Sequence, residues 1–119
     1  MRIGIFAGAG DVAAHVAAAK EVEADGFDSY WMSQIFGLDA LSVLTAIGLE
    51  VPRIELGTAV VPTYPRHPVV MAAQALTVQS ASAGRFTLGI GLSHQWVIEE
   101  MFGYSFDKPV RHMREYLSA

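Results

Sequence analysis

Residues 54–68 read IELGTAVVPTYPRHP, and the fold prediction starts from this stretch. The β-branched run Ile54–Val61 is typical of a buried strand, and Pro62–His67 is typical of a rigid loop that carries an aromatic ring and two basic side chains. A helix is expected to begin at Pro68, where the missing N–H costs no hydrogen bond, and to end at Gly84. The stretch therefore predicts one strand–loop–helix unit.

The same order of strand and helix recurs along the chain and gives about four units. The predicted strands are 2–7, 27–33, 54–61 and 86–91, and they begin roughly 30 residues apart, as βαβ units do. Helices are expected to open at Asp11, Asp39, Pro68 and Pro109, each of which is a good helix-starting residue. This alternation predicts an α/β fold with a parallel sheet.

Composition limits the classes of protein that this chain can represent. With 119 residues, 52% of them hydrophobic, residues 1–119 are expected to form one domain. Eight Lys and Arg against 12 Asp and Glu, without a basic run, argue against a nucleic-acid partner. No apolar stretch approaches the ~18 residues that cross a bilayer, so no membrane association is expected. The absence of cysteine fits the reducing cytoplasm, which is the expected location.

The segment Gly8–Ala13 matches the G-x-G-x-x-G/A pattern of dinucleotide-binding loops. Asp11 would place a carboxylate beside the pyrophosphate, and the segment Met32–Gln34 has no acid for the ribose. We therefore interpret this segment as a tight turn in which Asp11 caps the following helix.

Four histidines are the residues most suited to metal binding or proton transfer. None has the H-x-x-x-H or H-E-x-x-H spacing of a helical zinc site, so no metal is predicted. His15 and His112 are expected on exposed helix faces, and His67 is expected to shape a loop. His94 follows the fourth strand directly, at the edge where parallel sheets bind ligands, and is interpreted either as a proton-transfer group or as a structural hydrogen-bonding residue.

The connection Leu92–Lys108 is longer than an ordinary βα loop of ~2 to 6 residues. A helical turn is expected around Val97–Met101. The large side chains of Trp96, Met101 and Phe102 either pack on the wall of the fold or face a ligand, and the sequence leaves both alternatives open.

Three longer segments, Trp31–Gln34, Leu56–Pro68 and Gly84–His94, strongly resemble the luciferase-like monooxygenase superfamily, in particular its coenzyme F420-dependent oxidoreductase branch. The resemblance extends to Arg111–Leu117 and so covers essentially the whole chain. It implies a (β/α)8 TIM barrel in which a flat deazaflavin lies across the C-terminal mouth and exchanges hydride with a small organic substrate. A complete barrel takes ~250 residues, so this chain is expected to be the N-terminal half-barrel.

The resemblance also implies the residues that would line the ring. A cis peptide bond is expected between Ala59 and Val60, and His94 is the implied catalytic proton donor or acceptor. At the end of the second strand, Gln34 and Ile35 stand where some relatives carry an Asp-His pair, so the histidine acid is absent there, although the Gln34 amide can hydrogen-bond a ring carbonyl or nitrogen. The implied cofactor-binding residues are Gln34, Thr58, Ala59, Val60, Gly91, Ser93 and His94.

The family likeness leaves open which cofactor and which assembly the chain uses. An FMN-dependent monooxygenase on the same fold is the alternative to the F420 enzyme. A half-barrel that acts only through association with another chain is a further alternative, since its sheet edges and inner face would be uncovered. The expected partners are accordingly a second copy or a C-terminal half, and the chain alone is expected to bind its coenzyme poorly.

Overall fold

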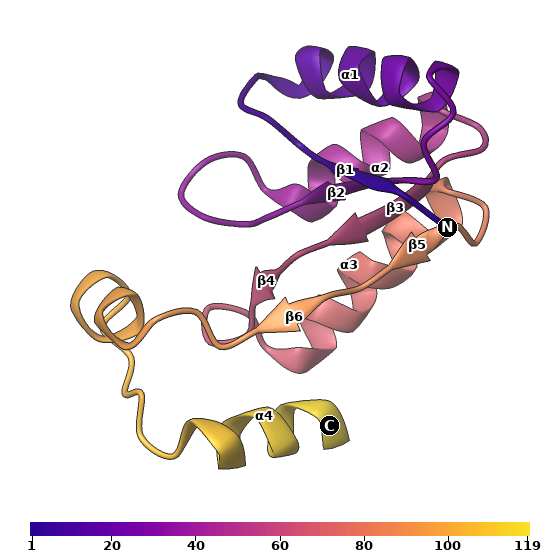
Figure 1. Cartoon of the computed structure of the whole chain (residues 1–119). Helices are drawn as coiled ribbons and strands as arrows, with labels where there is room; N and C mark the ends of the chain where they lie inside the picture. Colours follow the sequence, from indigo (N-terminus) through magenta and orange to yellow (C-terminus); the bar gives the residue numbers. More distant parts are fainter.

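The computed structural model describes residues 1–119 and contains a sheet whose strands are all parallel (Figure 1). Four strands lie side by side in chain order: β1 (Gly4–Phe6), β2 (Ser29–Met32), β3 (Glu55–Thr58) and β5 (Phe86–Thr87). Two short strands continue beyond β3 and β5 and pair with each other: β4 (Val61–Pro62) and β6 (Ile90–Gly91). Sequential order and parallel direction confirm the predicted βα units.

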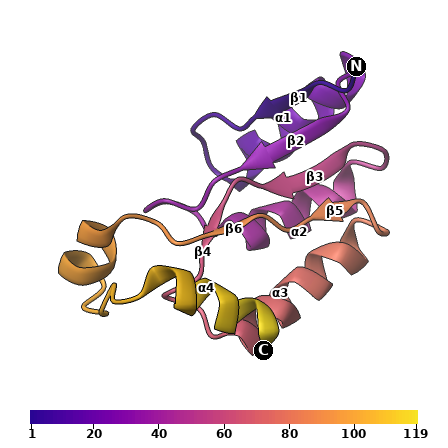
Figure 2. The same ribbon diagram turned by 60° about the horizontal axis from the view of Figure 1, so that its bottom comes forward.

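The helices that connect these strands cover one face of the sheet (Figures 1 and 2). They are α1 (Val12–Ala24), α2 (Ala40–Glu50) and α3 (Pro68–Ala81). Right-handed crossovers between sequential parallel strands place every connecting helix on the same side, which is the arrangement of a barrel wall. After β6 the chain forms one π-helical turn, η1 (Val97–Met101), and ends in α4 (Pro109–Ser118). No helix is both long and apolar enough to cross a bilayer.

Each connecting helix begins at a side-chain cap. The Asp11 carboxylate accepts a hydrogen bond from the Ala14 N–H at 2.8 Å, which confirms the predicted turn. Asp39 caps α2 in the same way, and the Nδ1 atom of His67 accepts from the first turn of α3. Gly26, with a φ of +84°, ends the first helical segment.

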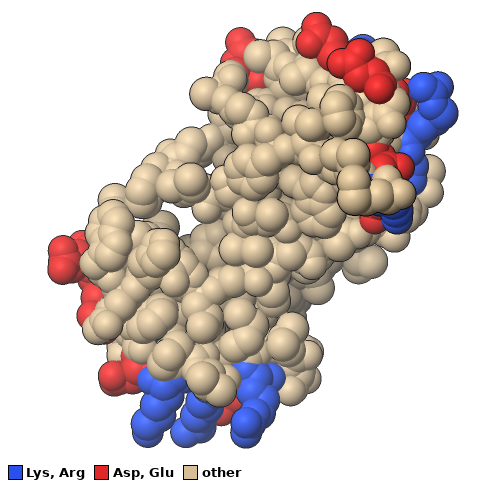
Figure 3. Space-filling model, in the orientation of Figure 1, with Lys and Arg blue, Asp and Glu red and all other residues tan.

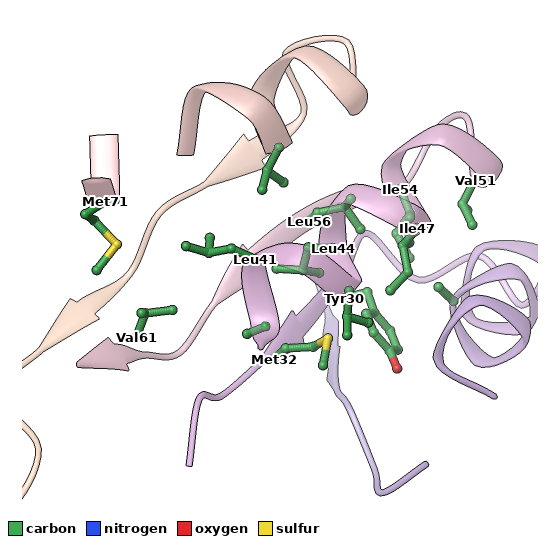
Figure 4. Close-up of a cluster of buried hydrophobic side chains, with 14 residues drawn as sticks. Tyr30, Met32, Leu41, Leu44, Ile47, Val51, Ile54, Leu56, Val61 and Met71 are labelled. Carbon is green, nitrogen blue, oxygen red and sulfur yellow. The ribbon is translucent and has the colours of Figure 1, made fainter. Parts of the chain in front are cut away.

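The hydrophobic core lies between the sheet and the helices, with α2 at its centre (Figure 4). Leu44 and Ile47 of α2 and Leu56 of β3 have no exposed surface. Burying each such side chain contributes roughly 1.5–3 kcal/mol. This layer holds the strands in register and so fixes where their carboxyl ends lie.

The opposite face of the sheet is largely uncovered. Phe6 of β1 is 58% exposed, and no residue of β1 is buried. Gly57 lets the indole of Trp31 lie flat on this face, because a Cβ at Gly57 would be 2.3 Å from the ring. In a barrel this face would be the interior.

Two predicted strands are interrupted at the same level of the sheet. The run 54–61 divides into β3 and β4 at Ala59–Val60, whose peptide bond is cis as expected, and the run 86–91 divides into β5 and β6. Between these breaks the Thr58 side chain takes over the hydrogen bonds that a regular ladder would make. At the break in the run 54–61, the Val60 carbonyl accepts a hydrogen bond from the Gln34 N–H in the loop after β2.

Candidate functional site

A cavity of about 280 Å³ lies where the ends of β2, β4 and β6 meet η1. Five of the predicted site residues line it: Gln34, Ala59, Val60, Ser93 and His94. Val60 and His94 follow different strands and share this one cavity, so the two strand ends converge on it.

Thr58 and Gly91, the other two predicted site residues, lie behind the cavity wall. Thr58 is 1% exposed, and its hydroxyl is bonded to the backbone of Gly89. Gly91 lies behind Val60, because a Cβ at Gly91 would be 2.6 Å from Val60 Cγ2. Both residues therefore place Val60 and do not themselves face the space.

Gln34 is held by two hydrogen bonds. Its backbone N–H donates to the Val60 carbonyl at 3.1 Å, and its side-chain oxygen accepts from the Ala40 N–H at 2.8 Å. The second bond uses the amide oxygen at the start of α2. The amide nitrogen then has donors left for the cavity, and no acidic group stands at this position.

The connection from β6 to η1 presents His94 to the cavity. Ser93 has a φ of +64°, a left-handed turn that redirects the chain after the strand. The His94 carbonyl accepts from the Ile98 N–H at 3.1 Å, which ties its backbone to η1. The imidazole itself makes no hydrogen bond, so either ring nitrogen is available to a ligand.

Two of the three large side chains of this connection face the cavity. Trp96 and Phe102 line it, being 54% and 40% exposed, whereas Met101 does not. For Trp96 and Phe102 the structure therefore favours the ligand-facing alternative. Their rings and Val60 give the cavity broad apolar walls.

The cavity has no formally charged side chain in its lining. Figure 3 shows the same character on the face drawn, where the hollow between the loop after β2 and η1 is bordered by uncharged atoms. Apolar walls with an amide, a hydroxyl and an imidazole at the rim suit a flat neutral ring with polar edges. They do not suit a phosphate group, which requires cations or free backbone N–H groups.

His15 and His112 are not the exposed helix residues that the sequence predicted. His15 is 6% exposed and its Nδ1 lies 3.0 Å from the Tyr30 hydroxyl. Ala19, which is also buried, lies one turn after His15 on the same face of the helix. This spacing was the signal in the sequence that could have predicted that His15 is buried.

His112 attaches α4 to the loop after β4. Its Nε2 lies 2.9 Å from the Thr63 hydroxyl, and its ring stacks on Tyr64 with centroids 3.9 Å apart. Burial, followed by the charges of Asp107 and Glu99, raises the pKa of Tyr64. The half-buried stack explains why α4 stays beside this loop although none of its residues is fully buried.

Comparison with known proteins identifies related sequences over this whole region. Residues 1–119 match the profile of a family described as luciferase-like monooxygenase. A Mycobacterium tuberculosis protein named "putative coenzyme F420-dependent oxidoreductase" is 38% identical over 102 residues, which are 86% of this chain and 28% of that protein. The chain thus spans less than a third of the length of this relative.

Solved structures share the fold at low sequence identity. The coenzyme F420-dependent tetrahydromethanopterin reductase of Methanopyrus kandleri matches with a TM-score of 0.77 and 24% identity, over 85% of this chain and 30% of that one. The oxygenating constituent of 3,6-diketocamphane monooxygenase from Pseudomonas putida, in complex with FMN, matches with a TM-score of 0.85 and 18% identity, over 98% and 37%. The four βα units are therefore half of a TIM barrel.

Proposed function

Because the chain belongs to the luciferase-like monooxygenase family, we propose that it supplies the ring-binding half of a coenzyme F420-dependent oxidoreductase. The observation that carries this proposal is the shared cavity of Gln34, Val60 and His94 at the carboxyl ends of the strands. Ligands of parallel α/β folds bind at this edge. The name of the 38% identical relative supports F420 as the coenzyme.

The shape and polarity of the cavity fit a deazaflavin ring. Val60 is 41% exposed and offers an apolar surface against which a flat ring can lie. The Gln34 amide and the Ser93 hydroxyl stand at the rim, where they can donate to carbonyl oxygens at the ring edge.

The chain's own residues divide the remaining work between orientation and proton transfer. A bound deazaflavin would supply or accept a hydride. His94 would hold or release the accompanying proton at a ring nitrogen, since its imidazole is free of other hydrogen bonds. Gln34 cannot do so, because a neutral amide does not titrate at ordinary pH. Its role would be to orient the ring.

The phosphate-bearing tail of the coenzyme would bind outside this cavity. No Lys or Arg lines the cavity, and the relative is more than three times as long as the matched segment. We propose that the rest of the barrel supplies the tail site and covers the open face of the sheet around Phe6. The substrate would be a small organic molecule reacting above the ring.

An FMN-dependent monooxygenase is the second candidate, favoured by the structural match to the FMN-bound protein from P. putida. Both coenzymes present a similar tricyclic ring, so the lining does not choose between them by shape. The two candidates differ in whether the cavity prefers a deazaflavin or a flavin ring. This preference can be measured with rings that lack the phosphate-bearing tail.

The test uses the two rings stripped of their phosphates. We would titrate the 119-residue chain with 8-hydroxy-5-deazariboflavin and with riboflavin, following ligand fluorescence. The expected result is binding of the deazaflavin about tenfold or more tighter than riboflavin. A preference for riboflavin would replace the proposal with the FMN enzyme. Binding of neither ring up to millimolar concentration would overturn both candidates.

A further inference from the structure

A second cavity, of about 480 Å³, lies between the loop after β1 and the loop after β2. Ser33 and Ile35 line both this cavity and the ring cavity, so the two spaces adjoin. Its other walls are the backbone of Gly8–Gly10, the loop after β2 and one buried imidazole, that of His15. No Lys, Arg, Asp or Glu side chain lines it.

The hydrogen bond between His15 and Tyr30 fixes which ring nitrogen carries the proton. Tyr30 is 1% exposed, and its hydroxyl has no hydrogen bond other than the one to His15 Nδ1 at 3.0 Å (Figure 4 shows the Tyr30 ring in the core). Burial raises the pKa of Tyr30, so the phenol keeps its proton. The buried hydroxyl proton has no other acceptor, so the phenol is paired only when it donates to Nδ1, and the imidazole proton then lies on Nε2, at the cavity.

The Nε2–H group of His15 has no partner within the chain. No hydrogen bond reaches this atom, although the residue is only 6% exposed and lines the cavity. The atom opens on the cavity and is not among the buried polar atoms that lack a partner, so a ligand with an acceptor atom can reach it and form the missing hydrogen bond. The Asp11 carboxylate at the nearby start of α1 disfavours an anionic ligand. A neutral acceptor remains as the matching chemistry.

We propose that this second cavity binds a neutral organic molecule through its carbonyl oxygen, with His15 Nε2–H as the hydrogen-bond donor. Tyr30 is the positioning residue that keeps the proton on Nε2. The further step of identifying this molecule as the reaction substrate rests on the proposed function, because the adjoining cavity would hold the ring. The binding itself does not depend on any coenzyme.

The test uses N-methyl-2-pyrrolidone, a small probe with a carbonyl acceptor and no donor, in the absence of coenzyme. Long-range proton–nitrogen NMR correlations of the imidazole rings report the tautomer of His15 directly in the unaltered chain. Backbone amide shifts of Gly8 and Gly10 report binding in the cavity. N-methylpyrrolidinium, which has the same ring but an ammonium donor in place of the carbonyl, is the matched control probe.

We expect the Nε2–H tautomer of His15 and a saturable response at Gly8 and Gly10 to the pyrrolidone alone. His15→Phe fills the same space without the donor and should weaken binding about tenfold or more. Tyr30→Phe should let the Nδ1–H tautomer appear and weaken binding less.

Three results would overturn the proposal. These are a dominant Nδ1–H tautomer in the unaltered chain, equal binding of the pyrrolidone by His15→Phe, and equal binding of the ammonium probe. The tautomer measurement needs no variant, so it decides the question even where a variant fails to fold. Failure of the ring titration leaves this test unaffected, so the two proposals fail separately.

Discussion

The hydroxyl of Thr58 donates to the carbonyl of Gly89 and also accepts from the amide of Gly89, both at 2.8 Å. A Cβ at Gly89 would lie 2.0 Å from the Thr58 carbonyl oxygen, so only glycine permits this approach. One side chain thus joins two strands where both are interrupted, directly below the cavity wall. The strength of this link can be measured.

Replacing Thr58 by valine should destabilise the fold by roughly 1–3 kcal/mol, because the Gly89 N–H loses its partner beside the buried Thr58 side chain, while the Gly89 carbonyl keeps only the Val61 N–H. Urea unfolding measures the change. Thr58→Ser retains the hydroxyl and loses one methyl group, so it should cost only about 1 kcal/mol. Equal unfolding midpoints for the valine variant and the unaltered chain would contradict the role given to the hydroxyl.

Gly91→Ala should weaken binding of the deazaflavin ring about tenfold or more, because the new Cβ would lie 2.6 Å from Val60 Cγ2 and displace the cavity wall. Fluorescence titration measures the affinity. Gly37→Ala is the matched control, since a Cβ there meets nothing within 4 Å and Gly37 lies outside the ring cavity. Similar affinities for both variants would show that Gly91 does not position Val60 for the ring.

Gln34→Glu should keep the fold stable while weakening ring binding. The carboxylate can still accept from the Ala40 N–H and suits the start of α2, where a negative charge contributes ~0.3–1 kcal/mol. It removes the amide donor and places a charge in an uncharged cavity. Thermal unfolding measures the stability, and ring titration measures the affinity. If Gln34→Glu binds the ring as tightly as the unaltered chain, the Gln34 amide does not orient the ring.

Removing the hydroxyl of Tyr64 and removing that of Tyr30 should have different effects on the stability of the fold. The buried hydroxyl of Tyr64 has no hydrogen-bond partner, so Tyr64→Phe should be neutral or stabilise the fold by up to ~1 kcal/mol while keeping the stack on His112. Tyr30→Phe removes the partner of His15 and should destabilise by about 1 kcal/mol. Denaturant unfolding of both variants, compared at one pH, checks the contrast; destabilisation by Tyr64→Phe would contradict it.

Alkaline pH should lower the stability through the buried tyrosines. Burial raises the pKa of Tyr30 and Tyr116, so the folded chain keeps these protons at a pH where the unfolded chain, with tyrosine pKa near ~10, releases them. Their contribution is therefore fully present below about pH 10 and declines as the pH rises above it. Unfolding free energies at increasing pH measure the slope, which should be shallower in Tyr30→Phe. A stability that rises above pH 10 would contradict this assignment.

Much of the barrel wall could be predicted from patterns among residues that are close together in the sequence. The caps at Asp11 and Asp39 and the proline start at Pro68 act within one helical turn, and the structure has each of them where the sequence predicted. The spacing of the strands likewise predicted four parallel units. These features depend on residues a few positions apart, so a single sequence contains the information.

The strand breaks and the partner of the buried His15 could not be predicted in this way. The break at Ala59–Val60 depends on Thr58 meeting Gly89, 31 positions later. The pairing of His15 with Tyr30, 15 positions later, depends on which face of α1 meets the sheet.

Patterns within the sequence were enough to predict the class of fold, the order of its units and the edge of the sheet at which a ligand is expected. The three-dimensional arrangement was needed to show that Gln34, Val60 and His94 line one cavity. It also showed that Thr58 and Gly91 lie behind the wall of that cavity and that His15 faces a second one. The difference lies in the distance along the chain over which each interaction acts. Helix caps and hydrophobic periodicity act between near neighbours in the chain, whereas a cavity exists only where side chains from distant strands stop short of filling the space between them.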